Sequence, residues 1–281
     1  MSKTFPTVGL VGSAPQAGMY ISPAQALGVE LLHVADGSRC DVVTVIDRSF
    51  ALSIVKRLEA DGVTVRPSFS ALTSSSEKYG STYDEQSTIC VMVARSPHGQ
   101  ATTWAASEIL RTNGLWVMSI TPAPGLTDSL QEKAQQLALD TSAQLSAVGV
   151  IAVEFSIKGE ELSVVNVEMH PMSSGNWTVD GAVTSQFEQH LRAILDLPLG
   201  DPSMTSRFVV TGNVYCGDKP NMYRPYLHLM ARTPAMKFHQ YKNSNEHGAL
   251  VGHVTLAGNN LDQIVEEIKH ALQYMQGEIE E

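Results

Sequence analysis

The sequence predicts a mixed fold, in which a parallel α/β region is followed by a region of the α+β class. Strand-like runs alternate with helical runs over residues 1–70, a pattern typical of a parallel sheet. Further along, two strand-like runs meet at the tight turn Lys158-Gly159, which indicates an antiparallel hairpin. The 281 residues are enough for one large domain or a few small ones with a real core.

The first region contains short apolar runs separated by helical patterns. Apolar residues at helical spacing, Leu52, Val55 and Leu58, predict a helix that ends at Gly62. The expected strands are 7–11, 29–34, 40–46 and 63–67, and the expected helices are 15–28 and 49–62.

The second region begins after residues 67–86, a polar, Ser-rich stretch that is typical of a linker or a shortened connection. In the long helix that follows, Thr127 or Asp128 is the expected N-cap. The expected strands are 88–96, 101–107, 114–123, 150–157, 162–169 and most short runs from 199 to 258. The expected helices are 127–149, 184–197 and a last one from Asn260, with Leu261, Val265, Ile268 and Leu272 on its buried face.

The composition excludes several classes of partner. A net charge of −10 repels phosphate backbones, so we expect no nucleic-acid partner. The three cysteines, Cys40, Cys90 and Cys216, are far apart, which favours buried free thiols over a metal site or disulfides. No apolar run approaches the ~20 residues of a membrane span. We therefore expect no membrane association and a cytoplasmic location.

The stretch "NVEMHPMSSGNWT", residues 166–178, places polar groups just beyond a predicted strand. Loops on a rigid sheet commonly carry binding groups. Glu154 and an acid near the far end of the second strand could bind a hard cation such as Mg²⁺. Two solvated or hydrogen-bonded acids are the other interpretation of the same spacing.

The stretch from Val148 to Gly200 closely resembles the end of the ATP-grasp domain of the N5-carboxyaminoimidazole ribonucleotide synthetase family. Within it, "SGNWTVDGAVTSQFEQHLRAILDLPLG" is highly specific to that family. The stretches "VARSPHGQ", "GLWVMSITPAP" and "GHVTLAG" support the resemblance, which therefore covers most of the chain.

The resemblance implies three domains. These are a shortened, Rossmann-like pre-ATP-grasp domain at 1–70, an ATP-grasp domain without its lid at 71–200, and a small β-rich domain at 201–281. The family reaction uses ATP and bicarbonate to carboxylate the amine of aminoimidazole ribonucleotide, and Mg²⁺ neutralises the transferring phosphoryl group. The resemblance also implies a homodimer.

The chain departs from the family pattern where the family handles phosphate. The piece that builds the lid over ATP is missing after "SSSEKYG", and Asn166 stands where the family has its second metal carboxylate. Glu246, Ala249 and Leu250 stand at the positions of a basic phosphate-binding loop. We therefore expect ATP to bind weakly or not at all, since phosphoryl transfer depends on positioning and electrostatics.

The site residues follow from the resemblance and from the hairpin. The expected acid–base groups are His170, Glu168 and Glu154, of which Glu154 and Glu168 are the candidate Mg²⁺ ligands. The expected ligand-binding residues are Glu108, Arg95, Asn166, Ser173, Trp177 and His247. Packing or bracing of the sheet is the other interpretation of Trp177, Glu108 and Arg95.

Three functions compete at this point. The preferred one is a protein that binds a small polar, imidazole-like or ribonucleotide-like ligand and catalyses ATP-independent chemistry on an amine or carboxylated amine, outside purine synthesis. The second is an ATP-dependent 5-(carboxyamino)imidazole ribonucleotide synthase of purine biosynthesis. The third is a non-catalytic dimeric partner or regulator.

Overall fold

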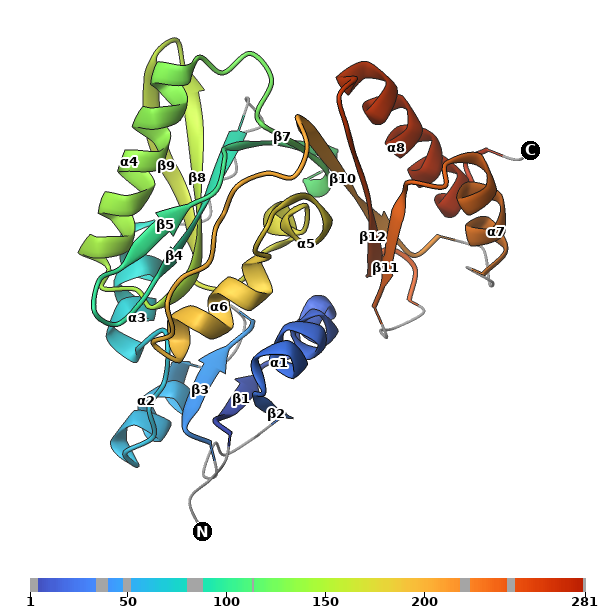
Figure 1. The fold of residues 1–281 in the computed structure, drawn as a ribbon. Helices are drawn as coiled ribbons and strands as arrows, with labels where there is room; N and C mark the ends of the chain where they lie inside the picture. The colour runs from blue at the N-terminus through green and yellow to red at the C-terminus, as the bar shows by residue number, and fades with distance from the viewer. Residues whose placement is uncertain are drawn as a thin grey trace.

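The computed structural model contains two sheets with helices packed on them (Figure 1). One sheet has three strands in the order β2-β1-β3, and the other has nine strands. The structure describes residues 5–33, 40–47, 52–79, 88–112, 114–217, 223–241 and 246–279. The mixed α/β class expected from the sequence is confirmed.

The small sheet confirms the parallel pattern predicted for the first region. Strands β1 (Thr7–Val11), β2 (Glu30–His33) and β3 (Val42–Val45) pair in parallel. Its helices are η1 (Pro15–Tyr20), α1 (Ile21–Leu27) and α2 (Leu52–Ala60). The strand expected at 63–67 is wrong, because only Val65 forms a bridge, to Val43. Pro67 has no N–H and could not donate to a longer ladder.

Residues 69–78 correct the prediction of a polar linker. They form helix α3 (Phe69–Lys78), whose N-cap is the Ser68 side chain, which accepts a hydrogen bond from the Ala71 amide. The helix buries Ala71 and Ser75. The next described element is strand β4 (Thr88–Arg95). The rest of the expected linker, 80–86, lies outside the described residues.

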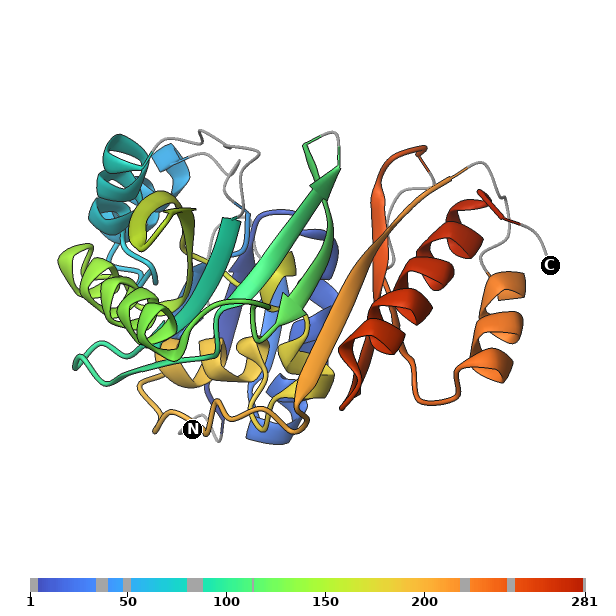
Figure 2. The same ribbon diagram turned by 90° about the horizontal axis from the view of Figure 1, so that it is seen from above.

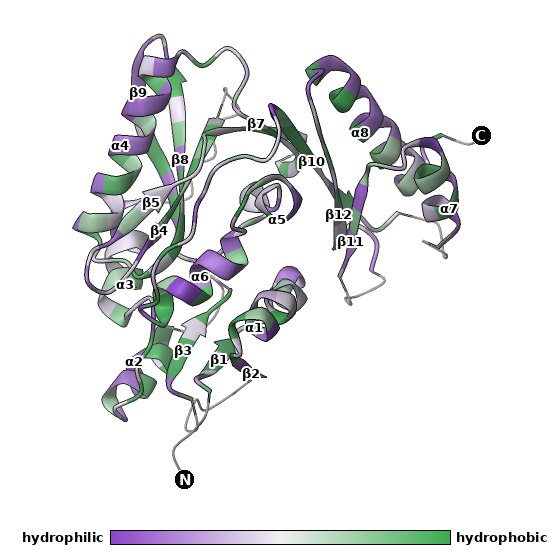
Figure 3. Ribbon diagram, in the orientation of Figure 1, coloured by the Kyte–Doolittle hydropathy of each residue, from purple (hydrophilic) through white to green (hydrophobic). Residues whose placement is uncertain are grey.

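The large sheet runs in the order β11-β12-β10-β7-β6-β4-β8-β9, with β5 paired to β4. Helices α3 and α4 cover one face near β4 and β8, and α5 and α6 cover the other (Figure 1). Figure 3 shows the apolar composition of the central strands. The strands are β5 (Ala101–Thr103), β6 (Ser107–Thr112), β7 (Leu115–Thr121), β8 (Gly149–Lys158), β9 (Glu161–Glu168), β10 (Phe208–Tyr215), β11 (Lys237–Gln240) and β12 (Leu250–Gly258). The helices are α4 (Asp128–Gln144), η2 (Ser173–Gly175), α5 (Thr178–Gly181) and α6 (Gln186–Ile194).

The C-terminal strands belong to the same sheet, because β10 pairs with β7 on one side and with β12 on the other. Helices α7 (Tyr223–Arg232) and α8 (Leu261–Gln276) lie beyond these strands (Figure 2). The sequence prediction did not include α7, although Pro225 lies in its first turn, where a missing N–H is tolerated. None of the described helices combines the length and the apolar composition needed to cross a lipid bilayer.

Helix α8 starts after Asn260 as predicted, and the Asn260 side chain accepts a hydrogen bond from the Gln263 amide. Its buried face is rotated from the expected one, since Leu261 and Val265 are only partly buried. The buried residues are Ile264, Ile268, Ala271, Leu272 and Met275. Ile268 and Leu272 are buried as predicted, so the helical period was right and the centre of the buried face is only shifted.

Candidate functional site

The β8–β9 hairpin places three polar side chains on one face of the large sheet. Glu154 lies directly opposite Asn166, and Ala152 lies opposite Glu168. The register shifts after Glu154, which leaves Val165 as an extra residue in β9. Because alternate strand residues share a face, Asn166 and Glu168 lie on the side of Glu154.

These side chains form a buried hydrogen-bonded network. The Asn166 amide donates to Glu154 Oε1 at 3.2 Å and to Glu168 Oε1 at 3.4 Å. The Arg111 guanidinium donates to Glu154 Oε2 at 2.7 Å. His170 Nε2 lies 3.8 Å from Glu168 Oε2. We call these five residues, Glu154, Asn166, Glu168, Arg111 and His170, the carboxylate centre.

Arg111 is the residue of this centre that the sequence prediction did not include. Its guanidinium lies 5.0 Å from the centre of the Trp116 ring, so the ring helps to hold the cation in place. Only 11% of the Arg111 side chain and 2% of the Glu154 side chain are exposed. An ion pair this well buried depends strongly on both partners, because either charge alone would lack compensation.

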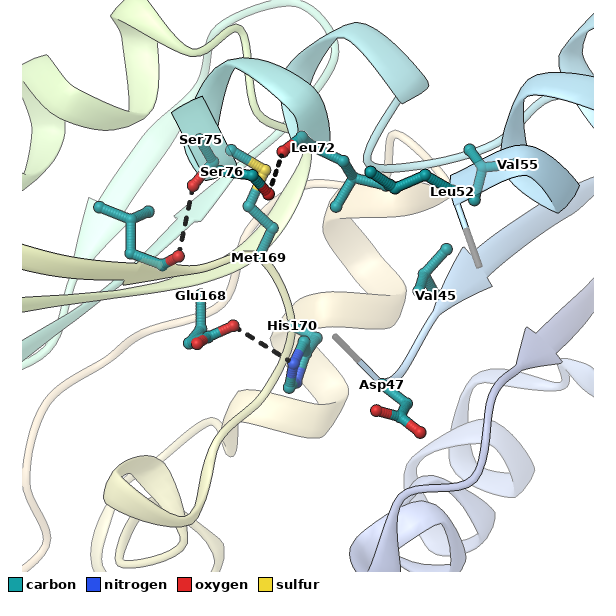
Figure 4. A pocket seen from close by; sticks show the side chains of 11 residues that line it. Val45, Asp47, Leu52, Val55, Leu72, Ser75, Ser76, Glu168, Met169 and His170 are labelled. Carbon is teal, nitrogen blue, oxygen red and sulfur yellow. Dashed lines mark hydrogen bonds and ion pairs between the residues drawn. The ribbon is translucent and has the colours of Figure 1, made fainter. Parts of the chain in front are cut away.

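A small cavity opens beside the carboxylate centre (Figure 4). Its volume is about 110 Å³, enough for a few water molecules or one small polar group. Asp47 follows β3 and contributes a second carboxylate to the lining, besides that of Glu168. The apolar part of the lining comes mainly from β3, α2 and α3, so the cavity lies where the two sheets meet.

The carboxylate oxygens have the chemistry of a cation site. Glu154 Oε1 and Glu168 Oε1 both lie within hydrogen-bond distance of one nitrogen, Asn166 Nδ2, so they converge on one place. Two carboxylate oxygens, with an amide oxygen if the Asn166 side chain turns over, are ligands that suit Mg²⁺. The residues fit that ion once Arg111 and the amide N–H groups no longer occupy the carboxylates.

Other predicted residues next to the centre pack rather than face a cavity. Trp177 is fully buried and belongs to the same apolar cluster as Cys90, Met92 and Trp104. Ser173 begins the short helix η2 and is partly buried. Cys90 is buried as expected, whereas Cys40 and Cys216 are only partly buried. Burial and the negative charge of Glu154 raise the pKa of the Cys90 thiol to about 12.

Three predicted ligand-binding residues lie away from the carboxylate centre. Glu108 pairs with Ile89, which pairs with Phe155, so Glu108 lies on the opposite face of the sheet from Glu154. Burial raises the pKa of Glu108. Arg95 lies at the far end of β4 and donates to the Ala147 carbonyl at 3.0 Å, which braces the sheet. His247 lies in an exposed turn before β12.

His190, which the sequence prediction did not include, is buried and links the two sheets through hydrogen bonds. It lies on α6 between the two sheets, where its Nδ1 accepts a hydrogen bond from the Val150 amide at 3.0 Å. Nε2 is therefore the protonated nitrogen, and it donates to Thr44 Oγ1 at 2.8 Å. Burial, with a smaller contribution from the charge of His170, lowers the pKa of His190 to about 3. The ring is neutral at physiological pH and joins β3 to β8.

Comparison with known proteins identifies the large sheet. Residues 82–187 match the ATP-grasp domain. Over 191 residues the chain is 40% identical to N5-carboxyaminoimidazole ribonucleotide synthase of Mycobacterium tuberculosis, a match that covers 66% of this chain and 44% of that protein. The enzyme of the same name from Bacillus subtilis is 32% identical over 182 residues, 64% of this chain and 46% of that protein. The matched part is thus less than half of the length of these relatives.

Solved structures of the same group have the same fold. N5-carboxyaminoimidazole ribonucleotide synthetase from Thermus thermophilus aligns over 98% of this chain and 99% of that chain, with a TM-score of 0.81 and 22% identity. The Aspergillus clavatus synthase, in complex with ADP and 5-aminoimidazole ribonucleotide, aligns over 97% and 99% with a TM-score of 0.85 and 17% identity. The chain thus contains an ATP-grasp domain at residues 82–187 and is similar to the N5-carboxyaminoimidazole ribonucleotide synthases over 66% of its length.

Proposed function

We propose that the chain acts as an ATP-dependent ligase that carboxylates the amine of 5-aminoimidazole ribonucleotide. The observation that carries this proposal is the convergence of Glu154 and Glu168 on Asn166 inside the ATP-grasp match. The similarity to the mycobacterial synthase over 66% of the chain favours this function over the ATP-independent chemistry that the sequence departures favour.

Glu154 and Glu168 would hold Mg²⁺, and the Asn166 carbonyl oxygen would complete the set of protein ligands. The ion, when bound, neutralises phosphate charge and lets the phosphoryl group transfer. In the ligand-free protein Arg111 compensates the charge of Glu154. Once released, its planar guanidinium could pair with a phosphate or a carboxylate, a role for which arginine is well suited.

His170 and Asp47 border the cavity where a small reacting group would lie. His170 Nδ1 is within 3.1 Å of the Pro171 carbonyl, a contact that fits a protonated Nδ1 and orients Nε2 toward Glu168. A histidine in that position could act as the base that accepts a proton from an amine. Glu168 would stabilise the charge that His170 gains.

ADP release is the direct test. Purified protein is incubated with ATP, Mg²⁺ and bicarbonate, with and without 5-aminoimidazole ribonucleotide, and ADP is measured. We expect ADP formation that depends on the ribonucleotide and falls by at least about 100-fold in Glu154→Gln, since a metal-binding charge is lost. Glu188→Gln is the matched control, because Glu188 pairs with Arg192 at the surface of α6. A wild-type protein that forms no ADP under these conditions would contradict the proposal.

A second candidate is ligand binding without ATP. The buried Arg111–Glu154 pair favours it, because that pair already satisfies one of the carboxylates that Mg²⁺ would need. Calorimetry with 5-aminoimidazole ribonucleotide alone separates the two functions. Binding that is unaffected by ATP and Mg²⁺ but lost in His170→Ala would support this candidate. The homodimer and the three-domain division remain predictions, and light scattering tests the first of them.

A further inference from the structure

A second polar cluster lies away from the carboxylate centre, where α5 meets the strands β11 and β12 (Figure 1). Asp180 on α5, His239 on β11 and His253 on β12 each offer one potential ligand atom, and these atoms lie within 4.8 Å of one another. Among the residues that the structure describes, this is the one group of three or more acidic, His or Cys side chains with such spacing. We call it the histidine centre.

Antiparallel pairing brings the two histidines together. His239 and His253 are directly opposite each other in β11 and β12, so their side chains leave the sheet on the same side. Their rings stack with centroids 4.6 Å apart and planes 20° from parallel. His239 Nε2 lies 2.7 Å from Asp180 Oδ2. Three different elements therefore present ligands to one small volume.

His253 gives an independent sign of a missing partner. The residue is only 1% exposed, and its Nδ1 lies 2.6 Å from the Tyr241 hydroxyl. Nε2 is also buried, and no described residue forms a hydrogen bond with it. Buried polar atoms in proteins nearly always have a partner, so such an atom calls for an explanation.

The contact with Tyr241 occupies one ring nitrogen of His253 and leaves the other facing away from the tyrosine. The Asn176 amide donates to the Tyr241 oxygen at 3.0 Å, and the Tyr241 hydroxyl and His253 Nδ1 share a hydrogen bond whose donor depends on the imidazole tautomer. A neutral ring with its proton on Nδ1 leaves Nε2 free to bind a metal, the arrangement usual for metal-bound histidines.

We propose that the histidine centre binds Zn²⁺ through the Asp180 carboxylate, His239 Nε2 and His253 Nε2. Two imidazoles and one carboxylate are a set of ligands that zinc prefers, whereas Mg²⁺ and Ca²⁺ prefer oxygen ligands alone. A tetrahedral zinc ion with bonds of 2.0–2.1 Å needs ligand atoms roughly 3.3 Å apart. Asp180 and His239 are partly exposed, so their side chains can close the remaining gap.

The site stands independently of the proposed ligase activity, because it shares no residue with the carboxylate centre. Zinc there would tie α5 to the β11–β12 strands. The chain of hydrogen bonds from His253 runs through Tyr241 and Asn176 to Gln186, which also bonds the backbone of Met172. Three protein ligands leave a fourth position for water or a ligand.

Metal binding can be measured directly on the full chain, without any polyhistidine tag. Chelator-treated protein is dialysed to equilibrium against Zn²⁺, and the bound metal is counted by mass spectrometry. The Co²⁺-loaded protein is examined for the strong visible absorption of a four-coordinate ion. We expect about one Zn²⁺ per chain, since the part of the chain that the structure describes holds one three-ligand group.

The variants His239→Gln and Asp180→Asn should each weaken Zn²⁺ binding by at least about 100-fold. The matched control is His98→Gln, which disrupts another His–carboxylate pair, to Asp196, where His98 Nε2 lies 3.3 Å away. Circular dichroism checks the fold of each variant, and the isosteric Asp180→Asn decides if His239→Gln does not fold. Absence of bound zinc in the wild type, or equal binding by wild type and Asp180→Asn, would overturn the proposal.

Discussion

The carboxylate centre and the histidine centre both contact the segment that follows β9, yet their buried polar atoms are satisfied differently. In the carboxylate centre Glu154 and Glu168 each accept a hydrogen bond from Asn166, and Arg111 supplies a compensating charge. In the histidine centre His253 Nε2 is buried without a partner among the described residues. In the described part of the chain, His170 Nε2 in the carboxylate centre is also buried without a hydrogen-bond partner, but the two carboxylates there are already paired, whereas the histidine centre lacks a partner at one of its proposed ligand atoms. A ligand must therefore displace protein contacts in one place and supply a missing contact in the other.

The largest expected effect follows from removing the Arg111 guanidinium from the carboxylate centre. Arg111→Ala leaves the buried Glu154 carboxylate without its charge partner, so we expect the free energy of unfolding to fall by about 3–5 kcal/mol. Urea denaturation measures this change. The control is Arg192→Ala, which breaks the more exposed Arg192–Glu188 pair and should change stability by less than about 1 kcal/mol.

Adding Glu154→Gln to Arg111→Ala sharpens the same test. If the destabilisation comes from an uncompensated charge, the double variant should regain part of the lost stability. A double variant less stable than Arg111→Ala by the full effect of Glu154→Gln would show that the two side chains act independently.

His190 extends the comparison, because it is buried like His253 but has both ring nitrogens bonded. Its pKa is about 3 in the folded protein and near 6.5 in the unfolded chain. The unfolded state thus binds more protons between these values. The stabilisation is fully present above about pH 6.5 and is lost as the pH falls toward 3.

Measuring the free energy of unfolding across this pH range in wild type and His190→Gln isolates the contribution of His190 titration to stability. We expect the wild type to lose on the order of a few kcal/mol more than the variant on acidification. The variant loses the neutral-pH hydrogen bond to Val150 or Thr44 but carries no titratable ring. Parallel pH profiles would show that His190 titrates equally in both states.

Zinc should stabilise the histidine centre and leave the carboxylate centre unaffected. At a free concentration about 100 times the dissociation constant, Zn²⁺ should raise the free energy of unfolding by about 2.7 kcal/mol. Thermal unfolding with and without Zn²⁺ measures this increase. Asp180→Asn should show no increase, and Glu168→Gln should show the wild-type increase.

The smallest expected effect concerns the residue behind the histidine centre. Tyr241→Phe removes the hydroxyl that contacts both Asn176 and His253. We expect a loss of about 1 kcal/mol in stability and a roughly 10–100-fold weaker affinity for zinc. Calorimetric titration distinguishes this from Tyr226→Phe, whose ring packs against Phe238 instead.

Local patterns were sufficient to predict most elements of the fold. Helical spacing identifies α6 and α8, the N-cap Thr127 marks the start of α4, and the turn at Gly159 identifies the β8–β9 hairpin. They did not identify α3, because a Ser-rich helix that buries only a narrow stripe resembles a loop in sequence. Local patterns also did not fully identify which side of α8 is buried, because that depends on the strands against which the helix packs.

The sequence predicted more of the carboxylate centre than of the histidine centre, because the histidine centre is assembled from elements that are far apart in the chain. Glu154 and Asn166 lie on one hairpin, so their proximity follows from local sequence, although the register shift that pairs them does not. Arg111 reaches Glu154 from β6 after a register shift at Leu110, which no local pattern reveals. Asp180, His239 and His253 come from three separate elements. Strand alternation places Glu108 and Glu154 on opposite faces of the sheet. This inference requires the pairing of β4 with β6 and β8, which the sequence alone does not reveal.

The continuity of the large sheet has a consequence for dividing the chain. Strand β10, which follows the expected domain boundary at residue 200, pairs with β7, which precedes it. Two fragments cut there would each carry a bare strand edge, and each edge would match the other fragment. Such fragments would aggregate when expressed alone. Expressed together, they would reassemble by strand complementation, so the boundary suits a split reporter better than an isolated domain.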